Sequence, residues 1–141
     1  MNQGLKMATP AQQLAAMKMY GAGQQSGKNN VPSYLEQEVY SWSKEKLILK
    51  MYDLFIVSAK RGDLNKMSRV LIELMGALNF EYEETATRLY RLYEYSQRCI
   101  FQKKVDEALH IVTELRNTWA EAFNLEEKQG EMQENIVKQA Q

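Results

Sequence analysis

Hydrophobic side chains recur three or four residues apart through most of the chain between Leu47 and Ala122. This spacing places them on one face of an α-helix, which repeats every 3.6 residues or so. Polar and turn-forming residues interrupt the pattern at three places, namely Arg61-Gly62-Asp63, Asn79-Phe80-Glu81 and Gln102-Lys103-Lys104. The pattern therefore predicts four amphipathic helices joined by short connections.

Each predicted helix has its own apolar stripe. Ser41 or Ser43 can cap the first helix, Gly62 can end it, and Asp63 can cap the second. Four such helices with short loops are expected to form an all-α, antiparallel up-down four-helix bundle. The stripes are Leu47, Ile48, Met51, Phe55 and Ala59, then Leu64, Met67, Leu71, Leu74 and Leu78, then Ala86, Leu89, Tyr93, Ser96 and Ile100, then Val105, Ala108, Val112, Leu115, Trp119 and Ala122.

The segments on either side of the predicted bundle differ from it in composition. Residues 1–30 are rich in Gln, Gly, Ala, Ser and Asn, and we predict a flexible extension that carries one short helix. Thr9 can cap this helix, Pro10 fits its first position, and Gly21 can end it. The bundle occupies residues 31–125. Residues 126–141 are rich in Gln and Glu and are predicted to be a polar tail, in which a fraying helix becomes mobile.

Charge and composition exclude several classes of protein. The chain has 18 basic and 18 acidic residues, and residues 31–119 are themselves neutral, so we expect no nucleic-acid partner and no anionic membrane surface as partner. A single cysteine, Cys99, cannot form an internal disulfide. No apolar run approaches the roughly 18 residues that a membrane-spanning helix needs, so we expect no membrane insertion. The first residues lack the apolar core of a secretory signal, which predicts a cytosolic protein.

The sequence offers little for catalysis. Glu107 and His110 are three residues apart on a helix, as in di-metal carboxylate bundles, but those sites need two such pairs and the chain has one histidine. Cys99 and His110 could in principle form a thiolate pair, although no third group is evident to orient them. Phosphate-binding and hydrolase motifs are absent. We therefore predict a binding module, with no enzymatic activity and no metal.

Tyrosine is the most informative excess, with eight in the chain. Tyr93 lies on the predicted core seam, whereas Tyr95 is rotated by about 200° from it and Leu92 also lies off the seam. Such off-seam residues indicate either edge packing or a docking groove. The segment from Tyr34 to Tyr40, before the first long helix, has two interpretations. It is either a hydrophobic staple that fixes the start of that helix, or a removable cover over a groove for a partner.

An ordered set of short motifs from about Tyr34 to Phe123 resembles the flagellin export chaperone family, FliS. No single motif is specific, but their order and spacing are. The motifs are Tyr34-Leu35 with Val39, Leu47-Ile48-Leu49 with Met51-Tyr52-Asp53, Gly62-Asp63 with Lys66, Leu78-Asn79, Leu92-Tyr93-Glu94-Tyr95, and Leu115-Arg116-Asn117-Thr118-Trp119.

The resemblance implies a cytosolic chaperone with an antiparallel four-helix bundle. Such a protein holds the disordered carboxy-terminal segment of flagellin, prevents premature polymerisation, and delivers flagellin to the flagellar type III export gate. It implies no cofactor, neither nucleotide nor metal. The partner-binding residues that it implies, for each of which core packing is the alternative, are Tyr34, Leu35, Val39, Leu47, Met51, Tyr52, Phe55, Leu92, Tyr93 and Tyr95.

Two further hypotheses follow from the residues around the bundle. The Met/Leu face of the predicted Thr9–Tyr20 helix and the linker after it suggest that this helix docks on the bundle as a mimic of the client. The tyrosine surface also leaves two alternatives to a flagellin chaperone. One is an adaptor for another secreted or flagellar client, and the other is a self-associating structural bundle, for which a homodimer is the simplest form.

Overall fold

The computed structural model describes residues 10–22 and 33–139, and these residues form helices with short connections and no strand. The predicted all-α fold class is therefore confirmed. The elements are α2 (Pro10–Ala22), α3 (Ser33–Ser41), α4 (Lys44–Lys60), α5 (Leu64–Gly76), the 3-10 helix η1 (Phe80–Tyr82), α6 (Glu83–Phe101) and α7 (Val105–Gln139).

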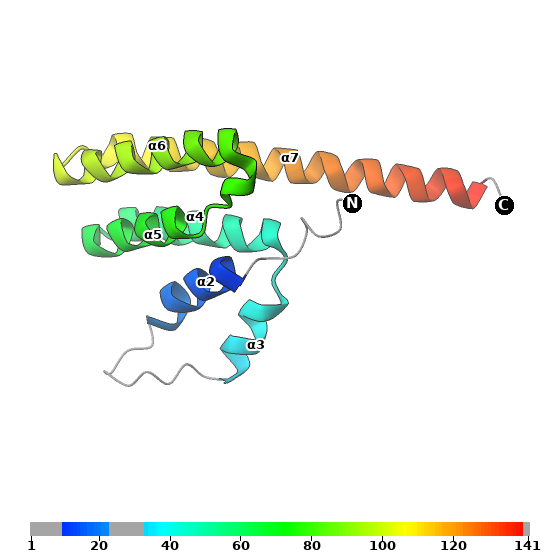
Figure 1. Ribbon diagram of the computed structural model, residues 1–141, viewed down its shortest axis with the longest axis horizontal. Helices are drawn as coiled ribbons and strands as arrows, with labels where there is room; N and C mark the ends of the chain where they lie inside the picture. The colour runs from blue at the N-terminus through cyan, green and yellow to red at the C-terminus, as the bar shows by residue number, and fades with distance from the viewer. Residues whose placement is uncertain (1–9, 23–32, 140–141) are drawn as a thin grey trace.

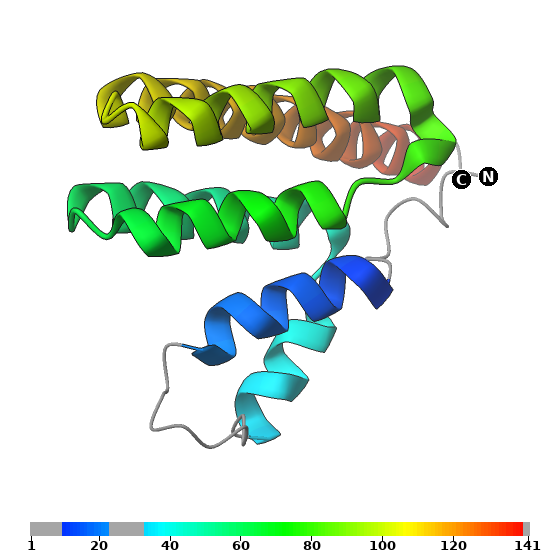
Figure 2. The same ribbon diagram turned by 60° about the vertical axis from the view of Figure 1, so that its left-hand side comes forward.

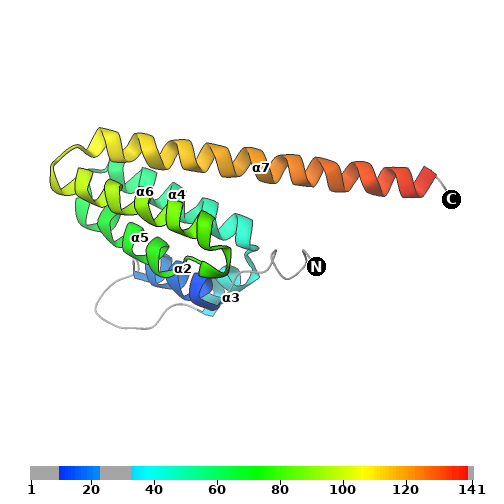
Figure 3. The ribbon, with the colours of Figure 1, turned by 45° about the horizontal axis from the view of Figure 1, so that its top comes forward.

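Helices α4, α5, α6 and α7 lie side by side, and successive helices run in opposite directions (Figures 1 and 3). Helix α4 packs against α5 and α7, and α6 packs against the same two helices. The four helices therefore enclose one core. All the predicted stripe residues are buried or half-buried except Ala122. Ala122 is exposed.

Side-chain hydrogen bonds cap the first turns of α4 and α5 at positions that the sequence predicts. The Ser43 hydroxyl accepts a hydrogen bond from the Lys46 amide at 3.1 Å, and the Asp63 carboxylate accepts one from the Lys66 amide at 3.1 Å. Both side chains satisfy amides that have no partner within the first helical turn. Gly62 has a φ of 72° and makes the tight turn between the two helices.

Helices α5 and α7 differ from their predicted extents. Helix α5 ends at Gly76, two residues before the last predicted stripe residue, Leu78. Helix α6 begins at Glu83. Two glutamates lie in its first turn, where their negative charge is stabilised by the positive end of the helix dipole. Helix α7 continues to Gln139, because residues 126–139 contain strong helix formers, a single Gly130 and no proline.

The short helix predicted near the amino terminus is α2, and it packs against α4 and α5 (Figure 2). Ala15, Ala16 and Met19 are its buried residues. The helix continues one residue past Gly21, and the predicted Thr9 cap and the linker beyond residue 22 lie outside the described residues. Helix α3 packs against α2 and points away from the four long helices (Figures 1 and 2).

The turn after α6 contains a lysine in a conformation that usually belongs to glycine. Lys103 has a φ of 61°, and its amide and that of Lys104 donate to the carbonyls of Ile100 at 3.0 Å and Cys99 at 2.7 Å. This is the hydrogen-bond pattern of a helix end at which glycine normally supplies the left-handed residue. A residue with a β-carbon pays a conformational penalty there.

We predict that Lys103→Gly raises the free energy of unfolding by about 0.5–1 kcal/mol, because relief of the left-handed strain exceeds the added chain entropy. Gly62→Ala is the matched reverse change, and we expect it to lower stability by about 1 kcal/mol. No atom lies within 4 Å of the added β-carbon at Gly62, so the cost there is conformational. Urea unfolding measures both. A Lys103→Gly variant no more stable than the parent would contradict the prediction.

Candidate docking groove

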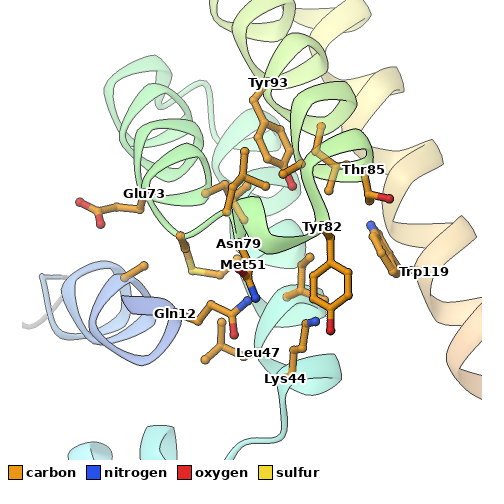
Figure 4. Close-up of a pocket in the computed structure, with 17 residues that line it drawn as sticks. Gln12, Lys44, Leu47, Met51, Glu73, Asn79, Tyr82, Thr85, Tyr93 and Trp119 are labelled. Atoms are coloured by element: carbon orange, nitrogen blue, oxygen red, sulfur yellow. The ribbon is translucent and has the colours of Figure 1, made fainter. Parts of the chain in front are cut away.

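An apolar groove of about 270 Å³ lies where α2, α4, α6 and the end of α5 meet (Figure 4). It is larger than the roughly 150 Å³ apolar cavity that suffices to bind benzene in an engineered core. It can therefore accept more than one apolar side chain. The lining residues are Gln12, Ala15, Lys44, Leu47, Ile48, Met51, Glu73, Leu74, Ala77, Leu78, Asn79, Tyr82, Thr85, Ala86, Leu89, Tyr93 and Trp119.

The groove exists at this end of the bundle because α5 and α6 are not joined by a tight turn there. Helix α5 stops at Gly76, and the chain then crosses to α6 through Asn79 and η1. The Asn79 side chain accepts a hydrogen bond from the Glu81 amide at 3.0 Å and so starts η1. This crossing places Leu78 and Tyr82 in the wall of the groove.

The charged groups of the groove lie among its edge residues. Lys44 contributes from the first turn of α4, and its Nζ lies 5.7 Å from the centroid of the Tyr82 ring. Glu73 contributes from α5 and points away from the other lining side chains (Figure 4). An apolar centre with charged groups at the edge is the usual arrangement of a surface that binds an amphipathic segment.

A pair of buried tyrosines lies beneath the groove. The hydroxyls of Tyr52 and Tyr93 are 2.7 Å apart, and both side chains are fully buried, so the pair joins α4 to α6 across the core. Desolvation by burial raises the pKa of Tyr52 to about 12, against the smaller opposing effect of hydrogen bonds with Tyr93 and Trp119. Burial also raises the pKa of Tyr93 well above its usual value. Both phenols are therefore neutral near pH 7, and their hydrogen bond replaces the water that they lose.

An ion pair joins α4 to α7 beside the tyrosine pair. Arg116 Nε donates to Asp53 Oδ1 at 2.6 Å, and both side chains are partly exposed. Tyr52 and Asp53 thus bind two different helices from consecutive positions of α4. Exposure makes the ion pair a modest contribution to stability, but it fixes the register of α7 against α4.

Helix α2 reaches the groove and is held by contacts beside it. Ala15 lies in the lining, and Gln12 points towards Leu47 (Figure 4). The Tyr20 hydroxyl donates to the carbonyl of Lys50 at 2.6 Å, and its ring lies edge-on to Trp42 at 5.3 Å between centroids. Of the buried side chains of α2, Ala15 and Ala16 are small and Met19 is large.

The partner-binding residues that the sequence predicts on the long helices fall in three places. Leu47, Met51 and Tyr93 lie in the groove lining. Tyr52 and Phe55 are fully buried in the bundle core. Leu92 and Tyr95 are 37% and 38% exposed on the outer side of α6, away from the groove, and the Tyr95 hydroxyl donates to the Glu107 carboxylate.

The predicted residues of the Tyr34–Tyr40 segment belong to α3 and lie outside the groove lining. Tyr34 is 67% exposed, whereas Val39 is fully buried. The side chain of Leu35 lies outside the described part of the chain. The segment next to the groove is α2.

Several lining residues escaped the prediction. Ala86 and Leu89 are core-stripe residues whose spacing does not separate groove from core. Tyr82 and Thr85 lie between the predicted break at Asn79-Phe80-Glu81 and the first stripe residue of the third helix, Ala86. Ala15 lies in the predicted amino-terminal helix, and the hypothesis that this helix docks on the bundle could have placed it near the groove.

The structure places the residues considered for metal or thiolate chemistry in three different environments. Glu107 accepts the hydrogen bond from Tyr95, His110 is exposed, and Cys99 is buried. Among the described residues, no three side chains of the metal-ligating types lie close enough together to hold an ion. The helices in that same part of the chain include none long and apolar enough to cross a membrane.

Comparison with known protein families gives a match. The family model described as flagellar protein FliS matches residues 57–126, which is about half of the chain. The matched region runs from the last turn of α4 through α5, η1 and α6 into α7. Neither the curated proteins nor the solved structures give a match.

The buried tyrosines predict a loss of stability at alkaline pH. Because the pKa of Tyr52 is higher in the folded state than the usual value of 10, its contribution is complete below about pH 10 and is lost as pH rises towards 12. We expect the free energy of unfolding, measured with urea, to fall above about pH 10 by up to about 1.4 kcal/mol per pH unit for each of the two tyrosines. Tyr93→Phe should reduce this fall, whereas Tyr90→Phe, at an exposed position, should not. A wild-type stability that is flat across this range would contradict the prediction.

Proposed function

Because this chain belongs to the FliS family of flagellar proteins, we propose that it is the chaperone that binds the disordered carboxy-terminal segment of flagellin. The family implies a chaperone role in flagellum biogenesis. The proposal adds the client, its protection from premature polymerisation, and its delivery to the type III export gate.

The observation that supports this proposal most strongly is the apolar groove with charged groups at its edge. A disordered segment can fold into a short amphipathic helix as its apolar side chains enter such a groove. The ordering of that segment costs several kcal/mol of the interaction energy, so the complex stays reversible. Reversible binding suits a chaperone that must release flagellin at the export gate.

The predicted partner-binding residues take different parts in this proposal. Leu47, Met51 and Tyr93 would contact the client in the groove, and Tyr52 and Phe55 would position them from the core. The exposed side chains of Leu92, Tyr95 and Tyr34 would contact parts of the client that extend beyond the groove, whereas the fully buried Val39 would hold α3 in place.

We further propose that α2 occupies part of the client surface. It contributes Gln12 and Ala15 to the groove lining, and it is attached through the buried side chains of Ala15, Ala16 and Met19 and through a few polar contacts. A client helix with larger apolar side chains would bury more area at the same place and displace it. Helix α2 would then lower the apparent affinity for the client without blocking it.

The remaining parts of the proposal follow from the same family role. The protein would act in the cytosol as a binding protein without catalytic activity, and it would need neither a nucleotide nor a metal. An adaptor for another secreted or flagellar client would use the same groove. Self-association as the main role is a weaker candidate, which is favoured by the exposed Met132 and Ile136 on α7.

Titration calorimetry with the carboxy-terminal peptide of flagellin from the same organism tests the client. We expect one-to-one binding with a micromolar or lower dissociation constant, a negative heat-capacity change and a gain of helix. Thr85→Glu, at an exposed position in the groove lining, should raise the dissociation constant at least about tenfold, because it brings a charge into an apolar contact. Thr118→Glu, on the exposed side of α7, is the matched control. Absence of binding by both the full chain and one lacking residues 1–30 would exclude flagellin as client.

Undocking α2 tests its role separately. Ala16 is fully buried and Ala11 is exposed on the same helix, so Ala16→Asp should release α2 and Ala11→Asp should leave it docked. We expect Ala16→Asp and deletion of residues 1–30 both to increase the affinity for the flagellin peptide, with Ala11→Asp unchanged. If affinity is the same with α2 docked, undocked and deleted, α2 does not compete with the client.

A further inference from the structure

Glu73 is the one acidic side chain among the described residues that line the groove. It comes from α5 and lies on the side of the groove where α2 passes (Figure 4). The other lining residues are uncharged except Lys44, whose Nζ lies over the Tyr82 ring. A single carboxylate at the edge of an apolar groove can discriminate between bound segments by their charge.

The Glu73 carboxylate is largely withdrawn from water and has a weak partner. Its side chain is 24% exposed, and Nζ of Lys18 on α2 lies 3.9 Å from Oε1. That distance is too long for a direct hydrogen bond. The Lys18 side chain is itself 54% exposed and so stays hydrated. A carboxylate that has lost much of its water is stabilised most by a cation at hydrogen-bond distance, and Lys18 does not come that close.

Two basic residues of α5 lie on the same side of the helix as Glu73. Arg69 precedes it by one turn and is exposed, and Lys66 precedes it by two turns and is half-buried. Both belong to the bundle and stay in place whichever segment occupies the groove. They lower the negative potential at Glu73 equally for every occupant, so they do not choose between occupants.

Helix α2 shows which position of a docked helix meets Glu73. Ala15 lines the groove and Met19 is buried, and Lys18 comes three residues after the first and one before the second. Residues three apart lie on neighbouring parts of a helix surface. A helix that follows the path of α2 would therefore bring to Glu73 the residue three positions after one that enters the groove.

We propose that Glu73 is a specificity-determining residue, which selects a client helix with a lysine or arginine three residues after a side chain that enters the groove. This cation would make the direct, charge-assisted hydrogen bond that Lys18 does not make. An acidic residue at the same position would be repelled by Glu73 in a poorly hydrated contact. The inference rests on the proposed function, because it takes the client to replace α2.

The same contact would help the client to displace α2. Helix α2 leaves hydrogen-bonding capacity on the Glu73 carboxylate unused, and a client with a better-placed cation gains that interaction in exchange. Arginine suits the position best, because its planar guanidinium can donate two hydrogen bonds to one carboxylate. Charge at Glu73 and apolar burial in the groove would then favour the same segment.

Two variants of the full chain separate a role in client binding from a role in α2 docking alone. Lys18→Gln removes the ion pair from α2 only, and we expect it to lower the dissociation constant of the carboxy-terminal flagellin peptide about twofold. Glu73→Gln removes the partner of both segments. We expect it to raise that dissociation constant about fivefold, because the client loses the stronger contact.

Titration calorimetry measures both effects. Glu94→Gln, at an exposed position of α6 outside the groove lining, is the matched control and should leave the dissociation constant unchanged. Glu73→Gln should unfold at the same urea concentration as the parent chain, which excludes a loss of fold as the cause. If Glu73 served α2 alone, Lys18→Gln and Glu73→Gln would both lower the dissociation constant, and that result would overturn the proposal.

Substitutions in the peptide identify the cation. With each basic residue of the flagellin peptide changed to glutamine in turn, we expect one change to raise the dissociation constant about tenfold for the parent chain and to have little further effect for Glu73→Gln. Glu73→Lys should regain affinity when the peptide carries glutamate at that same position. Effects that simply add for every peptide, with no such regain, would overturn the proposal.

The failure of this inference and the failure of the proposed function give different results. If neither the parent chain nor Ala16→Asp binds the flagellin peptide, flagellin is excluded as client and the role proposed for Glu73 is excluded with it. If the parent chain binds the peptide and Glu73→Gln binds it as tightly or more tightly, flagellin remains the client and Glu73 does not select it.

Discussion

The hydrogen bond between the Tyr52 and Tyr93 hydroxyls is the interaction on which the rest of the structure depends. Two phenols are buried at the centre of a largely apolar core, and without the other each buried hydroxyl would have neither water nor a protein group as hydrogen-bond partner. The bond sets how far apart α4 and α6 lie across the bundle. The next residue on α4, Asp53, binds Arg116 and sets the position of α7.

The groove follows from this arrangement of the four helices. With α4, α6 and α7 held in place, the early end of α5 at Gly76 leaves an apolar space that the crossing chain and α2 only partly fill. Tyr93 belongs both to the central hydrogen bond and to the groove lining. The groove is therefore supported by the most buried part of the protein, which favours a preformed surface over one that assembles on binding.

The sequence predicted the helices better than the surface that they form. Caps such as Ser43 and Asp63 act within one helical turn, and the three-four spacing reports directly which side of a helix is buried. Groove and core share the same residue types, so spacing could not show that Met51 lines a groove while Phe55 does not. Helix α2 docks through Ala15, Ala16 and Met19, and three residues in one short helix give only a weak periodic signal. Helix α7 continues because nothing between residues 126 and 139 except Gly130 disfavours a helix, although the apolar signal fades.

Hydrogen exchange of the full chain, with and without the carboxy-terminal flagellin peptide, tests the central claim most directly, because it reports on the groove and on α2 in one experiment. The account predicts that the peptide slows amide exchange at the start of α6 and at the end of α5, and that it accelerates exchange in α2. Protection confined to other surfaces, with exchange in α2 and around the groove unchanged, would contradict it.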